Sequence, residues 1–186
     1  MCSGLPRTKM SQPEPAKLVK LFLSAIYSKP ESLNRVLGKL EERLGVIDYS
    51  TKEMSFEHTN YYEPEMGAPL FRQFFSFGNL IQPESLVEIK LFTNQLEQEE
   101  SEEGRRRINL DPGYVGMNQM VLATGKASAH RIYLREGIWA DLHLIFQAGS
   151  FQALPWTYPD YRSEPLIQLF NRLREFLKLR LRAGEE

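Results

Sequence analysis

Apolar residues dominate the stretch from Leu18 to Tyr27 (LVKLFLSAIY), a run of strand length. Such a run predicts a central strand that is buried on both faces. The next residues, Ser28-Lys29-Pro30-Glu31, resemble a capping box with Pro30 in the first turn of a helix. Apolar residues then recur at helical spacing from Leu33 to Leu44, and Gly45 can end that helix in a left-handed conformation.

The same reading predicts the remaining elements. Further strands are expected over Val46–His58, Leu70–Ile81 and Arg107–Leu110, with a loop at Tyr61–Pro69. A second helix is expected from Pro83, with an apolar face of Leu86, Ile89, Phe92 and Leu96, and it runs into the acidic stretch Glu97–Glu103. A short helix with Met117, Met120 and Val121, a hairpin of Ser128–Arg135 and Ile138–Gln147, and an amphipathic helix over Ser163–Arg182 follow.

Strands and helices in this order predict the fold class. The first six elements follow the βαββαβ order of a ferredoxin-like α+β sandwich. The short helix, the hairpin and the C-terminal amphipathic helix extend it. We expect residues 1–17 to be a disordered leader and residues 18–186 to form a single α+β domain.

Length, net charge and cysteine content limit how the protein can be stabilised, what it can bind and where it can be located. A chain of 186 residues can bury about 70% of its unfolded surface, so a disulfide or a metal is not needed to stabilise it. A net charge of −1 provides no bulk attraction to nucleic acid or to an anionic membrane. Cys2 is the single cysteine, which excludes an intramolecular disulfide and suits a reducing cytoplasm. No apolar run approaches the ~20 residues of a membrane span, so we expect a soluble cytoplasmic protein.

Two polar and aromatic segments are the candidates for chemistry, and the first is RRRINLDPGY from Arg105 to Tyr114. Asp111 precedes Pro-Gly, which favours a type II turn at the end of a strand. A carboxylate there can act as a general base or accept a ligand hydroxyl, or it can cap its own turn. Arg107, Asn109 and Tyr114 are candidate ligand-binding neighbours, although charge balance with the acidic stretch also explains the arginines.

The second segment is LPWTYPDYRS, from Leu154 to Ser163. Aromatic rings beside an arginine can sandwich a flat ligand, which makes Trp156, Asp160 and Arg162 candidate binding residues. The same residues can instead lock the C-terminal helix to the domain, with Asp160 and Arg162 paired. The sequence leaves both interpretations open.

Histidines supply the candidates for acid and base catalysis. A two-residue turn at Glu136-Gly137 would place His130 opposite His143, with Asp141 on the same face. Two imidazoles and a carboxylate could then reach a divalent ion, but a shift of register would separate them, and we predict no metal site. His130, His58 and Asp111 are the catalytic candidates if the protein is an enzyme.

Four stretches resemble one known family: FEHTNYYEPEMG, RRINLDPGYV, SAHRIYLREGIWAD and LPWTYPDYRS. They are similar to a bacterial and archaeal domain family of unknown function, numbered 4416. The resemblance implies no established activity, although some members carry the label of a GTP-binding protein. A P-loop is not expected here, because Ala127 follows Gly125-Lys126 and Met120 occupies the place of the first glycine.

Two functions therefore remain. The first is binding of a small anionic ligand, containing a nucleotide or a phosphate, at polar loops that end the strands. The alternative is a non-catalytic module that binds a protein or RNA through its sheet and basic C-terminal helix. The sequence identifies no cofactor and no oligomeric state, and it leaves open whether the protein is an enzyme.

Overall fold

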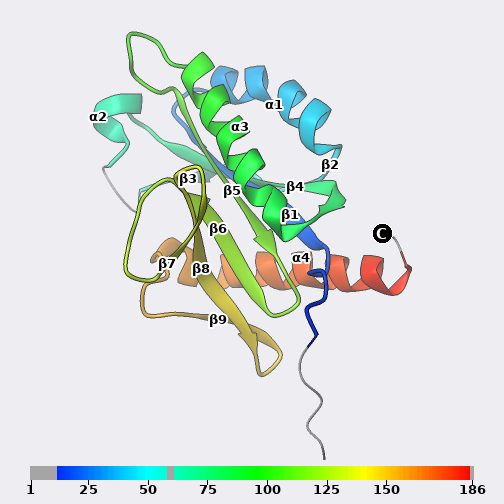
Figure 1. Cartoon of the computed structure of the whole chain (residues 1–186). Helices are drawn as coiled ribbons and strands as arrows, with labels where there is room; N and C mark the ends of the chain where they lie inside the picture. Colours follow the sequence, from blue (N-terminus) through cyan, green and yellow to red (C-terminus); the bar gives the residue numbers. More distant parts are fainter. Residues whose placement is uncertain (1–11, 58–60, 185–186) are drawn as a thin grey trace, which may run out of the picture.

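A nine-stranded antiparallel sheet forms the centre of the protein in the computed structural model, which describes residues 12–57 and 61–184 (Figure 1). The strand order is β2-β4-β1-β5-β6-β8-β7, with β3 added to β4 and β9 added to β8. The strands are β1 (Val19–Tyr27), β2 (Ile47–Ser50), β3 (Met54–Ser55), β4 (Phe71–Ile81), β5 (Ile108–Val115), β6 (Gln119–Thr124), β7 (Arg131–Arg135), β8 (Ile138–Gln147) and β9 (Ser150–Ala153).

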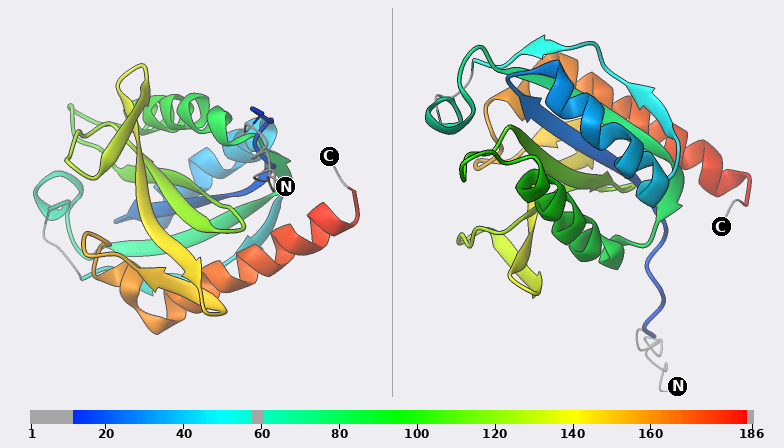
Figure 2. Two further views of the ribbon diagram at one scale, coloured as in Figure 1. Left: turned by 60° about the horizontal axis from the view of Figure 1, so that its bottom comes forward. Right: turned by 90° about the horizontal axis from the view of Figure 1, so that it is seen from above.

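Helices cover both faces of this sheet. The helices of the protein are α1 (Pro30–Leu44), α2 (Glu63–Met66), α3 (Leu86–Glu99) and α4 (Glu164–Arg182), with 3-10 turns η1 (Pro83–Ser85) and η2 (Asp160–Arg162). The short helix α2 lies to one side of the sheet (Figure 1). Helices α1 and α3 lie side by side on one face, and α4 crosses the other (Figures 1 and 2). None of the described helices combines the length and the hydropathy that a membrane crossing requires.

Strand β1 is central, as its apolar run predicted. All of its residues are buried, because β4 and β5 pair with its two edges and helices cover its two faces. Leu21 and Leu23 pack with α1 and α3, whereas Phe22 packs with α4. The strand therefore separates two apolar cores, and its continuous hydrophobic pattern follows from that position.

Helix α1 forms where its periodicity predicted, but the capping box does not. Lys29 occupies the N-cap position in an extended conformation, and its side chain makes no capping hydrogen bond. Ser28 is one residue too early to cap the first turn. Pro30 starts the helix, and Gly45 ends it with a φ of 97°.

Several predicted segments differ from the structure. The strand predicted over Val46–His58 is divided into β2 and β3, and His58 itself lies outside the described residues. The loop predicted at Tyr61–Pro69 contains the short helix α2, and β9 has no predicted counterpart. Of the expected leader, residues 12–17 are exposed and without regular structure, and residues 1–11 lie outside the described part.

The short helix predicted before Gly125 is wrong, because that segment is strand β6. Met120, Val121, Leu122 and Ala123 are all buried, and they pair with β8 along their length. Their apolar spacing suits either a helix or a strand. Pairing with neighbours that are distant in sequence decided between them.

The hairpin of β7 and β8 has the predicted turn. Glu136 and Gly137 have φ values of 54° and 76°, and Arg135 lies opposite Ile138. The register then shifts between Tyr133 and Arg135, so the predicted pairing of His130 with His143 is wrong. A bulge of one residue is enough to move every following pair.

Candidate functional site

The candidate site lies where strands β5 and β6 separate. Strand β5 was expected to end at Leu110 before a turn, but it continues through Pro112 to Val115, and it pairs with β6 only from Gly113 onward. Pro112 has no N–H to donate to a neighbouring strand, and beyond Leu122 strand β6 keeps its pairing with β8 but no longer pairs with β5. At Gly113 a Cβ would lie 2.6 Å from the carbonyl oxygen of Val121, so the two strands are close together there. They separate toward Asp111 on β5 and toward Thr124 on β6.

The edge of β5 that this divergence exposes is satisfied by side chains of α3. The peptide N–H of Leu110 donates to a carboxylate oxygen of Glu97 at 2.7 Å. The ammonium group of Lys90 donates to the carbonyl oxygen of Leu110 at 2.8 Å. Both side chains are buried. Their hydrogen bonds replace those that the backbone of a neighbouring strand would make with Leu110.

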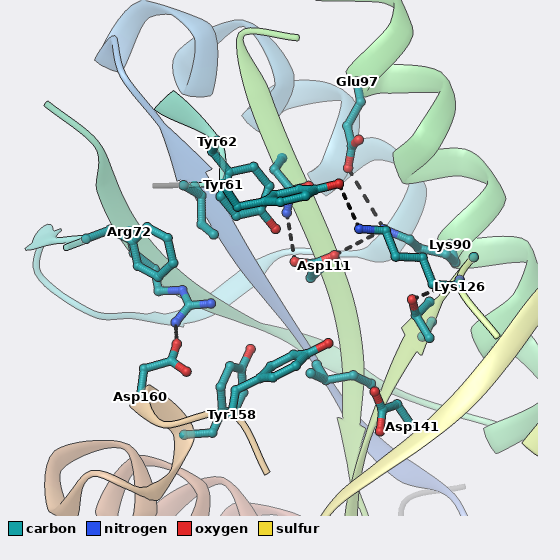
Figure 3. A pocket seen from close by; sticks show the side chains of 18 of the residues that line it. Tyr61, Tyr62, Arg72, Lys90, Glu97, Asp111, Lys126, Asp141, Tyr158 and Asp160 are labelled. Carbon is teal, nitrogen blue, oxygen red and sulfur yellow. Dashed lines mark hydrogen bonds and ion pairs between the residues drawn. The ribbon is translucent and has the colours of Figure 1, made fainter. Parts of the chain in front are cut away.

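A pocket of about 580 Å³ fills the gap between the separated strands, with Lys90, Asp111, Lys126, Tyr158 and other labelled side chains around it (Figure 3). Its walls come from distant parts of the chain: β1, the segments around α2, β4, α3, β5, β6, β8 and the loop before α4. The polar and aromatic residues that line it are Phe56, Tyr61, Tyr62, Arg72, Lys90, Asn94, Glu97, Arg106, Asn109, Asp111, Thr124, Lys126, Asp141, Tyr158, Asp160 and Tyr161.

Asp111 lies on the β5 side of this pocket and is held by two contacts. Its Oδ1 lies 3.3 Å from the ammonium nitrogen of Lys90, and its Oδ2 accepts a hydrogen bond from the side-chain amide of Asn109 at 2.7 Å. Its side chain keeps 29% of its surface exposed. The carboxylate is therefore fixed in orientation and remains accessible from the pocket.

Arg106, two residues before β5, belongs to the same group of charges. Its guanidinium makes two hydrogen bonds to the carboxylate of Glu65, and it also contacts Glu97 and Asn109. Burial raises the pKa of Glu97, and the charge of Lys90 opposes this shift. Each cation on this side of the pocket has a carboxylate partner.

The opposite wall is built around an ion pair between Arg72 of β4 and Asp160 of η2. Both side chains are buried, and the guanidinium of Arg72 lies over the rings of Phe56 and Tyr161 at 4.7 Å and 5.2 Å. Burial raises the pKa of Tyr161 to about 12. Asp160 thus pairs with Arg72 and not with Arg162, which donates to the backbone carbonyls of its own loop.

Lys126 stands at the rim, after the end of β6. Its ammonium group donates to the hydroxyl of Tyr61 at 2.9 Å, and this hydrogen bond lowers the pKa of Tyr61. Its backbone carbonyl accepts a hydrogen bond from Arg131, which also contacts Tyr158. Among the described residues, no carboxylate lies within 4 Å of the Lys126 ammonium.

Asp141 of β8 lies between the two histidines of the hairpin despite the shifted register. Its carboxylate oxygens are 3.4 Å from Nε2 of His130 and 3.3 Å from Nε2 of His143. Arg131 donates a hydrogen bond to this carboxylate at 2.7 Å, which is a shorter contact than either histidine makes with it. Burial would raise the pKa of Asp141, but His143 and Arg131 together lower it. In the described part of the chain, no three histidine, cysteine or acidic side chains are arranged to hold a metal ion.

The structure brings some of the predicted site residues together in the pocket and places the others outside it. Asn109, Asp111 and Asp160 line the pocket. His130 and Trp156 stack on each other at 5.2 Å just outside it, and Trp156 donates to the carbonyl of Leu142.

Other candidates have contacts elsewhere. Arg107 pairs with Glu102 in the acidic stretch, at 2.6 Å. Tyr114 packs with the small apolar cluster of β6, β8 and α3. Arg162 braces its own loop, and His58 is outside the described residues.

Sequence reasoning missed several lining residues. Lys90 and Glu97 lie on the buried face of α3, where Leu86, Ile89, Thr93 and Leu96 are also buried. Two charges seven residues apart within an apolar face are a signal that could have identified them. In the sequence, Lys126 stands out only through its comparison with a P-loop, and Arg107 rather than Arg106 is the predicted binding residue.

Fold and pocket together describe an α+β protein with a ligand-sized hollow at a split in its sheet. The chain belongs to a family of unknown function, because the model of the Domain of unknown function (DUF4416) matches residues 17–176. This confirms the family resemblance of the sequence. No curated protein and no solved structure matches the chain.

Proposed function

We propose that the pocket between β5 and β6 binds a small ligand that carries an anionic group, such as a phosphate. One observation supports this proposal most: charged and aromatic side chains from distant parts of the chain line a single hollow of about 580 Å³. Ligand sites in proteins are typically clefts of about 300–1,000 Å³ with apolar walls and a few polar groups.

Charge favours one end of the pocket for the anion. Arg72, Lys90 and Arg106 each have a carboxylate partner within 4 Å. Lys126 contacts a tyrosine hydroxyl instead and is exposed at the rim. An incoming phosphate can take a hydrogen bond from this ammonium group without displacing an ion pair.

Aromatic rings support a ligand with a flat or apolar part. Tyr61 and Tyr62 contact each other edge to face at 5.0 Å on one side of the pocket. Tyr158 and Tyr161 do so at 6.2 Å on the side of the loop before α4. Tyrosine rings provide apolar area at low conformational entropy and also offer hydroxyl groups to a polar ligand.

The proposed mode of binding is not that of a P-loop. Gly125-Lys126 follows strand β6, and the chain then continues through a loop into strand β7. A P-loop instead leads into a helix whose N-terminal amides hold the phosphates. Lys126 therefore acts in this proposal as a single charge beside Tyr61.

Thermal unfolding with candidate ligands tests the proposal. The full chain is heated with inorganic phosphate, sugar phosphates, nucleoside monophosphates and small carboxylates, each in turn. A ligand present at 100 times its Kd raises the free energy of unfolding by about 2.7 kcal/mol and so raises Tm. Titration calorimetry then measures Kd for each compound that shifts Tm.

Lys126→Met supplies the decisive variant, and Lys52→Met is its matched control. Lys52 is exposed between β2 and β3 and does not line the pocket. We expect Lys126→Met to weaken anion binding about tenfold or more, and Lys52→Met to leave it unchanged. Equal affinities in the two variants, or no Tm shift with any compound, would refute the proposed site.

A second function is supported by the outer face of α4. Phe176 and Leu179 are 48% and 61% exposed there, next to Arg172. Phenylalanine and arginine are enriched at protein interfaces relative to the rest of the surface. An interaction module is therefore the function to examine if the pocket binds none of the ligands.

A second proposal concerns the topology of the strands and helices beside the pocket. We propose that β1, β2, β4 and β5 with α1 and α3 form a ferredoxin-like unit. The strand order β2-β4-β1-β5 and the position of both helices on one face support this assignment. The β6–β9 strands then extend the unit, and the pocket lies at the junction.

A further inference from the structure

The carboxylate of Asp111 presents two unused hydrogen-bond acceptors in the pocket. An ionised carboxylate has about four lone-pair sites, two on each oxygen. Among the described residues, Oδ1 contacts only Lys90 and Oδ2 contacts only Asn109. Each oxygen thus keeps one acceptor site, and the side chain is 29% exposed to the hollow that it lines.

The surroundings of Asp111 restrict what can bind there. A phosphate is repelled by the carboxylate, so the anionic end of a ligand belongs near Lys126. A cationic group is disfavoured as well, because the ammonium of Lys90 already lies 3.3 Å from Oδ1. A neutral group with two adjacent donors remains, and two neighbouring hydroxyl groups on a sugar ring have this form.

We infer that the ligand is a phosphorylated sugar, with its vicinal diol hydrogen-bonded to Asp111 and its phosphate at Lys126. This inference rests on the proposed function, since it names the class of ligand for the same pocket. Lys90 and Asn109 orient the carboxylate and make no contact with the ligand in this assignment. The sugar can be free or part of a ribonucleotide, because both present the same diol.

Asp111 would distinguish a ligand that carries the diol from an analogue that lacks one of its hydroxyl groups. A site built to bind a hydroxyl group strongly rejects an analogue without it, since the buried acceptor is then left unpaired. Removal of one hydroxyl of the diol is therefore a sharper probe than removal of the phosphate. It changes the ligand and leaves the protein intact.

Titration calorimetry on the full chain tests this inference with four compounds: inorganic phosphate, ribose 5-phosphate, adenosine 5′-monophosphate and its 2′-deoxy analogue. We expect the 2′-deoxy compound to bind about tenfold or more weakly than the ribonucleotide. Ribose 5-phosphate with the affinity of the ribonucleotide would assign the ligand as a free sugar phosphate. A much weaker ribose 5-phosphate would assign a ribonucleotide, because the base then contributes.

Asp111→Asn converts the comparison into a double-mutant cycle. The amide keeps the shape of the side chain and removes one acceptor. We expect this variant to bind the ribonucleotide about tenfold more weakly and the 2′-deoxy compound with unchanged affinity. The wild-type comparison needs no variant, so it holds even if Asp111→Asn folds poorly.

The outcomes separate this inference from the proposed function. If no compound binds, including inorganic phosphate and the small carboxylates, the proposed function fails and this inference fails with it. If inorganic phosphate or a small carboxylate binds and neither nucleotide nor sugar phosphate does, the proposed function stands and this inference is overturned. If both nucleotides bind equally, and Lys126→Met weakens both, the anion site is supported and the diol assignment is overturned. An equal loss of both nucleotides in Asp111→Asn would also overturn it.

Discussion

At the scale of single residues, the backbone N–H and carbonyl of Leu110 explain why Lys90 and Glu97 are buried. These two backbone groups lie on an edge of β5 that has no strand beside it. Unpaired backbone groups in the interior are costly, so α3 supplies Glu97 and Lys90 as partners. The same two side chains then set the charge beside Asp111, which links a backbone requirement to the chemistry of the pocket.

Gly113 is in the last pair between β5 and β6, and there is no room for a side chain there. We predict that Gly113→Ala lowers the free energy of unfolding by roughly 1–3 kcal/mol, because the methyl group would lie 2.6 Å from both the carbonyl oxygen of Val121 and the ring of Phe22. Urea unfolding followed by circular dichroism measures the change.

Gly38→Ala in helix α1 is the control for this substitution. No atom lies within 4 Å of a Cβ at Gly38, so the change should be neutral or should stabilise by about 0.5–1 kcal/mol. A Gly113→Ala variant as stable as the wild type would show that β6 can move away, and the split would then not depend on this contact.

At the scale of elements, α4 is attached to the sheet by an aromatic cluster. Phe170 is fully buried and contacts Phe22, Phe74 and Tyr161, with ring centroids 5.1 Å, 6.1 Å and 5.7 Å away. Tyr161 also lines the pocket, so the helix and the pocket wall share one packing unit. The loop before α4 therefore combines both roles left open by its sequence: it braces the helix and forms a wall.

We predict that Phe170→Ala destabilises the protein by about 3–5 kcal/mol, because it removes a large buried ring and leaves a cavity. Phe176 lies on the same helix and is 48% exposed, so Phe176→Ala should cost less than about 1 kcal/mol. Urea unfolding of the two variants gives the comparison. Equal losses would contradict the assignment of the buried and exposed faces of α4.

Elements with many local signals were the ones that the sequence predicted. The apolar run of β1, the helical spacing of α1 and α4, and the Glu136-Gly137 turn all depend on neighbouring residues. Strand β6 and the bulge of β7 depend on partners far along the chain, and both were predicted incorrectly. Local spacing does not carry the information that decides pairing and register.

At the scale of the whole molecule, buried tyrosines couple stability to alkaline pH. Burial raises the pKa of Tyr27, Tyr62 and Tyr161, the last to about 12. A raised folded-state pKa gives stability that is present below pH 10, the pKa of an unfolded tyrosine, and is lost as pH rises further. Lys20 acts in the opposite direction, because burial lowers its pKa.

We predict that the free energy of unfolding falls between pH 10 and pH 12, and that Tyr161 accounts for roughly 2–3 kcal/mol of the fall. Tyr161→Phe should flatten this part of the profile, whereas Tyr133→Phe, at an exposed position, should not. Urea unfolding at several pH values provides the measurement. A steep decline that is unchanged in Tyr161→Phe would contradict this role.

The sequence by itself determined the class of fold, the central strand and the segments that supply Asn109, Asp111 and Asp160. These follow from hydrophobic period and from turn-forming residues, which act over a few neighbouring positions. Only the tertiary structure decided that β6 leaves β5 after Leu122, and that separation creates the pocket. It also decided that Lys90, Arg106 and Lys126 belong to the same hollow, because the path of a strand edge depends on pairings between residues far apart in the chain.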